Sequence, residues 1–174
     1  MVKVHRMNTR NVALIALFST IIFMEKLIIP APYDKMVSVF VQVTLLMLGY
    51  LIMGLSGSFF ISVLSGTLLA FVRAEFLFMT LSLSVTYGVL LGLSAKLLKV
   101  KSGVLINLRR LILSSTISSV FVGSIGMSLT MMLGLIPVSL SLFAVMFVAG
   151  IVQGALGGYV AGILWRRYLI KMYS

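Results

Sequence analysis

The stretch SLSLFAVMFVAGIVQGALGGYVAGILW, residues 139–165, decides the fold of this chain. It contains no charged side chain and ends directly before Arg166 and Arg167. An α-helix needs about 20 mostly apolar residues to cross a hydrocarbon core roughly 30 Å thick. Because this stretch is longer than that, the sequence predicts a transmembrane helix here.

The rest of the chain has the composition of a membrane protein. Of its 174 residues, 61% are hydrophobic and only 10% are charged, and the mean hydropathy is +1.21. A soluble domain carries about 25% charged residues on its surface. We therefore exclude a soluble fold and expect an all-α, polytopic membrane protein, with a single integral membrane domain over residues 1–174.

Similar apolar stretches, separated by charges, prolines and glycine-rich breaks, predict six transmembrane helices in a compact bundle. The predicted spans are residues 11–29, 36–54, 57–73, 76–95, 111–136 and 139–165. The second and third spans are two antiparallel helices, because together they are too long for one crossing at a rise of about 1.5 Å per residue.

The distribution of charge predicts the orientation of these spans. The formal net charge of +11 comes from 14 Lys and Arg against 3 Asp and Glu. Lys and Arg near span ends accumulate on the cytoplasmic side. With the N-terminus inside, the outer ends hold three cations and every acid of the chain: Lys26, Lys35, Arg73, Glu25, Asp34 and Glu75. We expect both termini inside, a multi-pass location in the plasma membrane, and no binding of nucleic acid.

Few residues are suited to catalysis. The chain has no cysteine and one histidine, His5, which excludes disulfides, thiol catalysis and cysteine-ligated metals. Ionisable groups at mid-depth would mark a proton or ion path, and the predicted spans contain none there. A nucleotide-binding loop is also missing from the sequence. We expect a protein that is not an enzyme and holds no metal and no cofactor.

Polar and adaptable residues toward the outer side are the candidates for binding a substrate. They are Tyr33, Asp34, Gln42, Arg73, Glu75, Tyr87, Met127, Met131 and Gln153. Methionine can line an adaptable apolar pocket, or it can simply fill gaps. Pairing and snorkelling at the membrane interface is the alternative for the charged residues, including Glu25 and Lys26. For Gln153 the alternative is a hydrogen bond between helices.

Small residues recur every fourth position in the last span, at Gly150, Gly154, Gly158 and Gly162. Such ridges let helix backbones approach closely in a membrane. Two interpretations stay open: the ridge packs against another helix of the same chain, or it is a docking face for another membrane subunit.

The layout of the whole chain resembles that of a known family. It has a basic N-terminal stub, a first span of the type NVALIALF (residues 11–18), a proline-containing outer loop, a Gly/Ser turn at residues 54–57, and six helices. This layout is similar to that of the substrate-binding S components of energy-coupling factor (ECF) transporters. The resemblance implies a protein that captures a vitamin or related micronutrient at its outer face. It also implies partners, namely a transmembrane T component and two cytosolic ATPase subunits.

The resemblance further implies roles for particular residues. In this family a small-residue motif on the first helix contacts the T component, and its nearest matches here are Ala13, Ala16 and Thr20. The family's cleft corresponds in position to Tyr33, Asp34, Tyr87 and residues 127–132. The alternative function is a small accessory or channel-like membrane protein that forms a homo-oligomer through its glycine ridge.

Overall fold

The computed structural model describes residues 9–28, 34–72, 76–102, 105–135, 137 and 139–170, without the side chains of residues 34–37 and 101–102. Six helices make up nearly all of this part of the chain. They are α1 (Thr9–Ile28), α2 (Asp34–Met53), α3 (Leu55–Val72), α4 (Leu77–Leu97), α5 (Leu108–Met132) and α6 (Leu140–Leu164), which continues as the π-helical turn η2 (Trp165–Leu169). A short hairpin of β1 (Lys101–Ser102) and β2 (Leu105–Ile106) joins α4 to α5.

The predicted all-α bundle is therefore confirmed. Five helices are long and apolar enough to cross a membrane: α1, α3, α4, α5, and α6 with its extension to Leu169. The part of α2 with described side chains, Ser38–Met53, is apolar but shorter. The structure thus supports a multi-pass membrane protein, whereas six crossings with both termini inside stay a prediction.

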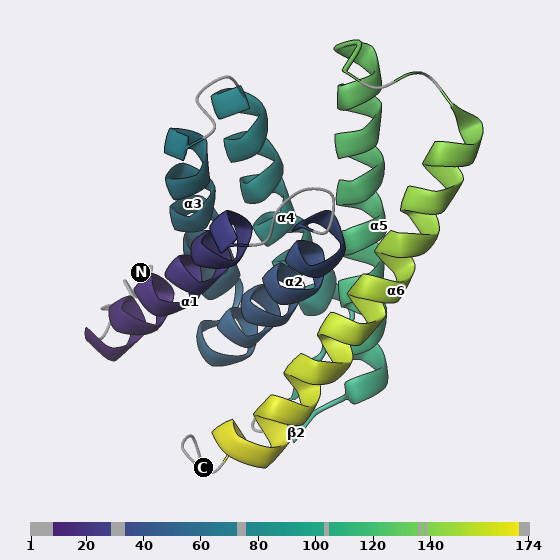
Figure 1. The fold of residues 1–174 in the computed structure, drawn as a ribbon. Helices are drawn as coiled ribbons and strands as arrows, with labels where there is room; N and C mark the ends of the chain where they lie inside the picture. Colours follow the sequence, from purple (N-terminus) through teal and green to yellow (C-terminus); the bar gives the residue numbers. More distant parts are fainter. Residues whose placement is uncertain are drawn as a thin grey trace, which may run out of the picture.

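The helices form one bundle with α1 at its edge (Figure 1). Consecutive helices from α3 to α6 pack against one another, and α2 packs against both α3 and α6. Helix α1 lies against α2 and α3. In Figure 1, α4 and α5 stand nearly upright, whereas α1, α2 and α6 cross them obliquely.

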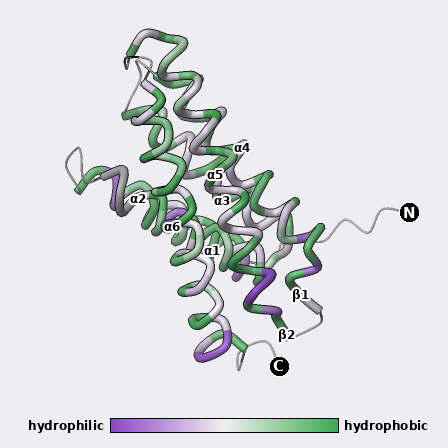
Figure 2. Tube along the Cα trace, turned by 90° about the vertical axis from the view of Figure 1, so that its right-hand side faces the viewer, coloured by the Kyte–Doolittle hydropathy of each residue, from purple (hydrophilic) through white to green (hydrophobic). Residues whose placement is uncertain are grey.

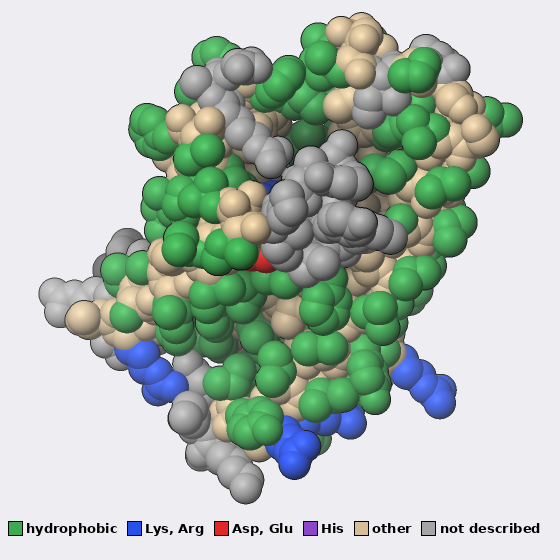
Figure 3. Space-filling model, in the orientation of Figure 1, with side chains coloured by type: hydrophobic (Ala, Val, Ile, Leu, Met, Phe, Trp, Pro, Cys, Tyr) green, Lys and Arg blue, Asp and Glu red, His purple; other side chains and the backbone are tan. Residues whose placement is uncertain are grey.

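Apolar residues cover the helices along most of their length, and hydrophilic residues gather at one end, near the hairpin and the C-terminal end of α6 (Figure 2). Most of the Lys and Arg side chains visible in Figure 3 follow the same pattern and lie along the lower edge of the molecule. Arg10 lies in the first turn of α1, Lys96 in the last turn of α4 with Lys99 just beyond it, and Arg109 and Arg110 in the first turn of α5. We name this side the cationic end; it corresponds to the predicted cytoplasmic side.

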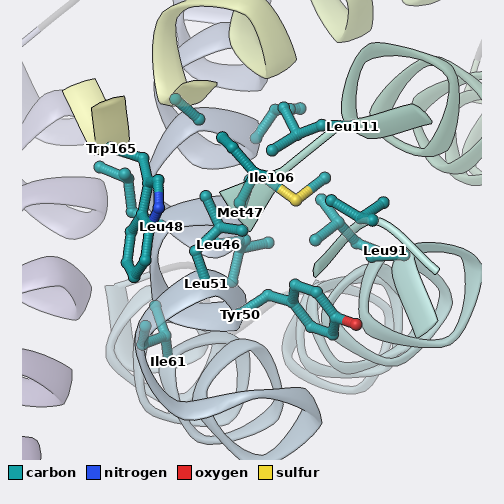
Figure 4. Close-up of a cluster of buried hydrophobic side chains, with 14 of the residues drawn as sticks. Leu46, Met47, Leu48, Tyr50, Leu51, Ile61, Leu91, Ile106, Leu111 and Trp165 are labelled. Atoms are coloured by element: carbon teal, nitrogen blue, oxygen red, sulfur yellow. The ribbon is translucent and has the colours of Figure 1, made fainter. Parts of the chain in front are cut away.

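The core is densest around α2 and toward the cationic end (Figure 4). Leu46, Met47 and Leu51 of α2 are fully buried and face Leu91 and Leu111 from α4 and α5. The hairpin belongs to this core, since Val100, Ile106 and the chain's one tryptophan, Trp165, are also buried. The link between α4 and α5 is therefore anchored to the bundle.

The glycine ridge of α6 lies inside the bundle, against α5. Gly150, Gly154, Gly158 and Gly162 are all buried. A Cβ atom added at Gly154 would lie 2.8 Å from the Cα of Thr116, closer than van der Waals contact allows. The structure therefore favours packing within the chain. It leaves no open face on this ridge for the predicted partner docking or for a homo-oligomer, because α5 covers it.

Candidate functional site

The predicted substrate-binding residues fall into two groups in the structure. Tyr33, Arg73 and Glu75 lie outside the described residues. Asp34 is the first residue of α2, and its side chain is not described. The other five, Gln42, Tyr87, Met127, Met131 and Gln153, have described side chains and lie on α2, α4, α5 and α6.

One of these residues, Gln42, belongs to a polar cluster between α1 and α2. The Nζ of Lys26 donates a hydrogen bond to the Oε1 of Gln42 at 3.4 Å. Gln42 is only 5% exposed, as is Ser38 one turn before it. Both carboxylate oxygens of Glu25 are also buried. We call Glu25, Lys26, Ser38 and Gln42 the α1–α2 polar cluster.

The helix periodicity explains why Lys26 faces inward. The buried residues of α1 are Ile15, Ser19 and Ile22, which are spaced as one face of a helix. Lys26 follows Ile22 by four residues and continues that face toward α2. Ser19 secures the same face, because its Oγ donates to the carbonyl oxygen of Ile61 in α3 at 3.2 Å.

The cluster has the donors and acceptors that a polar ligand requires. An ammonium group only donates hydrogen bonds, a carboxylate only accepts them, and an amide does both. Burying such groups costs free energy unless each is paired. A cluster kept at this depth, in a chain with 10% charged residues, is therefore a functional candidate.

Tyr87 belongs to a different contact, between α4 and α5. Its hydroxyl lies 2.7 Å from the Oγ of Ser119, and both residues are buried. Two turns along α4, the Oγ of Ser94 lies 2.8 Å from the Oγ of Ser118 and donates to the carbonyl oxygen of Ser114 at 3.2 Å. These hydroxyls hydrogen-bond across the interface, so Tyr87 ties two helices together.

Met127, Met131 and Gln153 come from other interfaces of the bundle. Met127 is 3% exposed, and Met131, about one turn later, is half-buried. Gln153 is half-buried too. It lies one turn before Gly157, whose added Cβ would meet Val43 of α2 at 2.8 Å, so Gln153 faces the side of α6 that packs on α2.

Figure 3 shows where these features lie on the molecule. An acidic side chain is visible near the middle of this face, away from the Lys and Arg side chains of the lower edge. Above it, the surface is hollowed between the upper ends of α3 and α4 and those of α5 and α6. The hollow is at the end opposite the cationic end, which is the predicted outer side.

The small residues predicted to dock a partner are accessible. Ala13, Ala16 and Thr20 are exposed on α1, on the side away from its buried face. The Thr20 hydroxyl donates to the Ala16 carbonyl oxygen at 2.8 Å, within the same helix. We call these three residues the α1 stripe.

Two features of the sequence mark sites that the list of candidate binding residues does not include. Glu25 and Lys26 are two adjacent charges inside an otherwise apolar span, a signal for a buried polar site. The arginines near the β1–β2 hairpin, whose charge predicts orientation, line a cavity that no sequence pattern revealed.

Comparison of the chain with protein-family models, with curated proteins and with solved structures finds no match in any of the three.

Proposed function

We propose that this chain is the membrane-embedded, solute-binding subunit of an ECF-type importer in the plasma membrane. It captures a vitamin or related micronutrient at its outer face and delivers it together with a T component and two cytosolic ATPases. The observation that carries the proposal is the α1–α2 polar cluster, with Gln42 buried and bonded to Lys26.

The position of the cluster supports a binding role. Glu25 and Lys26 lie near the C-terminal end of α1, whereas Arg10 of the cationic end lies at its start. In the predicted orientation the cluster therefore faces the outer side, where an importer meets its solute. Its charged groups, Glu25 and Lys26, are of opposite sign. A cluster with balanced charge favours a neutral or weakly charged ligand, since a strongly charged one would leave an excess charge buried.

The α1 stripe supports a partner on the same helix. Small residues on an exposed helix face allow the close backbone approach by which membrane helices associate. Two large apolar side chains on the same face of α1, Leu17 and Met24, are 54% and 46% exposed. Helix α1 therefore presents an apolar face with a small-residue groove to the membrane, as a transmembrane T component requires.

Binding is tested on purified protein in mild detergent. Native mass spectrometry reports a ligand retained from the cell, and thermal shift against a panel of water-soluble vitamins reports one that is added. We expect one panel member to raise Tm, and Gln42→Leu or Lys26→Met to abolish that shift. Thr67→Val is the matched control, because the Thr67 hydroxyl donates to the Val63 carbonyl oxygen of its own helix, α3.

Docking is tested by co-purification with the ATPase module of the source organism. Ala16→Leu should prevent co-purification and leave ligand binding intact. Val145→Leu adds bulk to an exposed position of α6 and should change neither property. No retained ligand, no thermal shift with any panel member and no co-purifying partner would together contradict the proposed function.

A further inference from the structure

A cavity at the cationic end lies apart from the α1–α2 polar cluster. It has a volume of about 660 Å³ and lies between the β1–β2 hairpin and the neighbouring helix ends. Four cationic side chains line it, Lys99, Arg109, Arg110 and Arg166.

The hairpin gives the cavity a fixed wall. The backbone N–H of Asn107 donates to the carbonyl oxygen of Val100 at 3.0 Å, closing the hairpin. Val100 is fully buried and Ile106 is 8% exposed, so both strands are anchored in the core. Lys99, the residue before Val100, has a positive φ of 49°, which turns the chain sharply from α4 into the hairpin.

Two of the arginines are held in place by backbone carbonyls. Arg110 donates through Nη1 to the Leu98 carbonyl oxygen at 3.4 Å. Arg166 donates through Nη2 to the Ile106 carbonyl oxygen at 3.3 Å. A guanidinium carries five N–H donors, so each arginine keeps donors for a further acceptor.

The cavity also contains the N-terminus of α5. Asn107 caps this 25-residue helix by accepting from the Arg110 backbone N–H at 3.3 Å. The first backbone N–H groups of a helix have no partner within the helix, and the helix dipole favours an anion there.

The sequence places no acidic side chain next to these four cations. Its only acidic side chains are Glu25, Asp34 and Glu75. Glu25 belongs to the α1–α2 polar cluster, Asp34 begins α2, and Glu75 precedes α4, whereas the cavity follows the end of α4. Among the described residues, no carboxylate lines the cavity. An anion from outside the chain would therefore be attracted to this cavity.

We propose that this cavity binds the phosphate group of an anionic lipid of the inner leaflet. Phosphate matches the planar donors of arginine and the N-terminus of a helix. Basic pockets between membrane helices on the cytoplasmic side are suited to lipid headgroups. The rim favours a lipid over free phosphate, since Leu105 lines the cavity and is 73% exposed, and Leu97, before Lys99, is 80% exposed. These leucines lie where acyl chains would follow the headgroup.

The test titrates the purified chain with dioleoyl phosphatidylglycerol and follows binding by native mass spectrometry. Lys99→Gln/Arg109→Gln removes two cavity charges and spares both guanidinium–carbonyl hydrogen bonds, so the fold is retained. The control Lys96→Gln/Arg167→Gln removes the same charge from the same end, outside the cavity. Two further arms use dioleoyl phosphatidylcholine and inorganic phosphate.

We expect the cavity variant to bind phosphatidylglycerol about tenfold more weakly, and the control within about twofold of the wild type. Phosphatidylcholine should bind about tenfold more weakly than phosphatidylglycerol to the wild type. Equal losses in both double variants would show attraction to net charge alone and overturn the site. Displacement of the lipid by millimolar inorganic phosphate would overturn the assignment to a lipid. None of these results depends on whether the chain binds a vitamin.

Discussion

Gly154→Ala should destabilise the bundle, although alanine is the better helix former. A Cβ atom at this position would lie 2.8 Å from the Cα of Thr116 and 2.9 Å from the carbonyl oxygen of Ser115. Both atoms belong to the backbone of α5, so no side-chain rotation removes the overlap. Helices α5 and α6 must move apart by roughly half an ångström, which weakens contacts along the whole interface.

The expected loss follows from two opposing terms. Overpacking a tight contact costs about 1–3 kcal/mol, whereas replacing glycine by alanine within a helix gains about 0.5–1 kcal/mol. The net loss is therefore about 0–2.5 kcal/mol, centred near 1 kcal/mol, and a loss of that central size lowers Tm by roughly 2–4 °C for a chain of this length.

Two other glycines provide matched controls. An added Cβ at Gly150, on the same ridge, would lie 3.5 Å from its nearest neighbours, and at Gly123 it would meet nothing within 4 Å. Alanine at either position should leave Tm unchanged or raise it slightly. Intrinsic fluorescence is a suitable readout, because the chain's one tryptophan, Trp165, is 1% exposed in the core.

The reasoning is refuted if Gly154→Ala melts like Gly150→Ala. A second refuting result is a wild-type homo-oligomer that Gly154→Ala dissociates into monomers with unchanged Tm. That outcome would show that the ridge faces another copy of the chain rather than α5.

Three further changes test other contacts. Tyr87→Phe removes a buried hydrogen bond and should lower the free energy of unfolding by about 1 kcal/mol, whereas Tyr159→Phe, at a position 47% exposed, should leave Tm unchanged. Asn107→Ala removes the cap of α5 and should cost about 1 kcal/mol; a wild-type Tm would contradict the capping role. For orientation, Leu135→Cys in this cysteine-free chain should react with a membrane-impermeant maleimide in intact cells, and Lys99→Cys only after permeabilisation. The reverse labelling pattern would place the N-terminus outside.

The helices were predictable because length and hydropathy alone define a membrane span. The predicted helix ends were less accurate where a capping residue determines the end of the helix. Charge predicted that the fifth span begins after Arg110, but α5 begins at Leu108, because Asn107 caps it and long arginine side chains extend away from the helix. The β1–β2 hairpin was missed, since strands of two residues leave no hydrophobic period in the sequence.

The rotation of each helix about its axis was not predictable. A span that is apolar on all sides has no preferred face, in contrast to an amphipathic helix. Predicted depth in the membrane placed Gln42 and Tyr87 in one candidate binding site. The structure instead places Gln42 against Lys26 of α1 and Tyr87 against Ser119 of α5. The glycine ridge was ambiguous for the same reason. Glycines at every fourth residue predict a close contact with another helix, but they do not identify that helix.

Helix α1 connects the two parts of the proposed function. It packs only at the edge of the bundle, against α2 and α3, and it carries the α1 stripe on its exposed side and Glu25 and Lys26 near its C-terminal end. Ala16 and Glu25 are nine residues apart in one helix, about 14 Å at a rise of 1.5 Å per residue. By contrast, α5 and α6 are held together by glycines that bring their backbones into contact. A partner that shifts α1 would therefore disturb the hydrogen bond from Lys26 to Gln42 at less cost than a movement between α5 and α6. Under the proposed function, docking on α1 would thereby promote release of the bound solute.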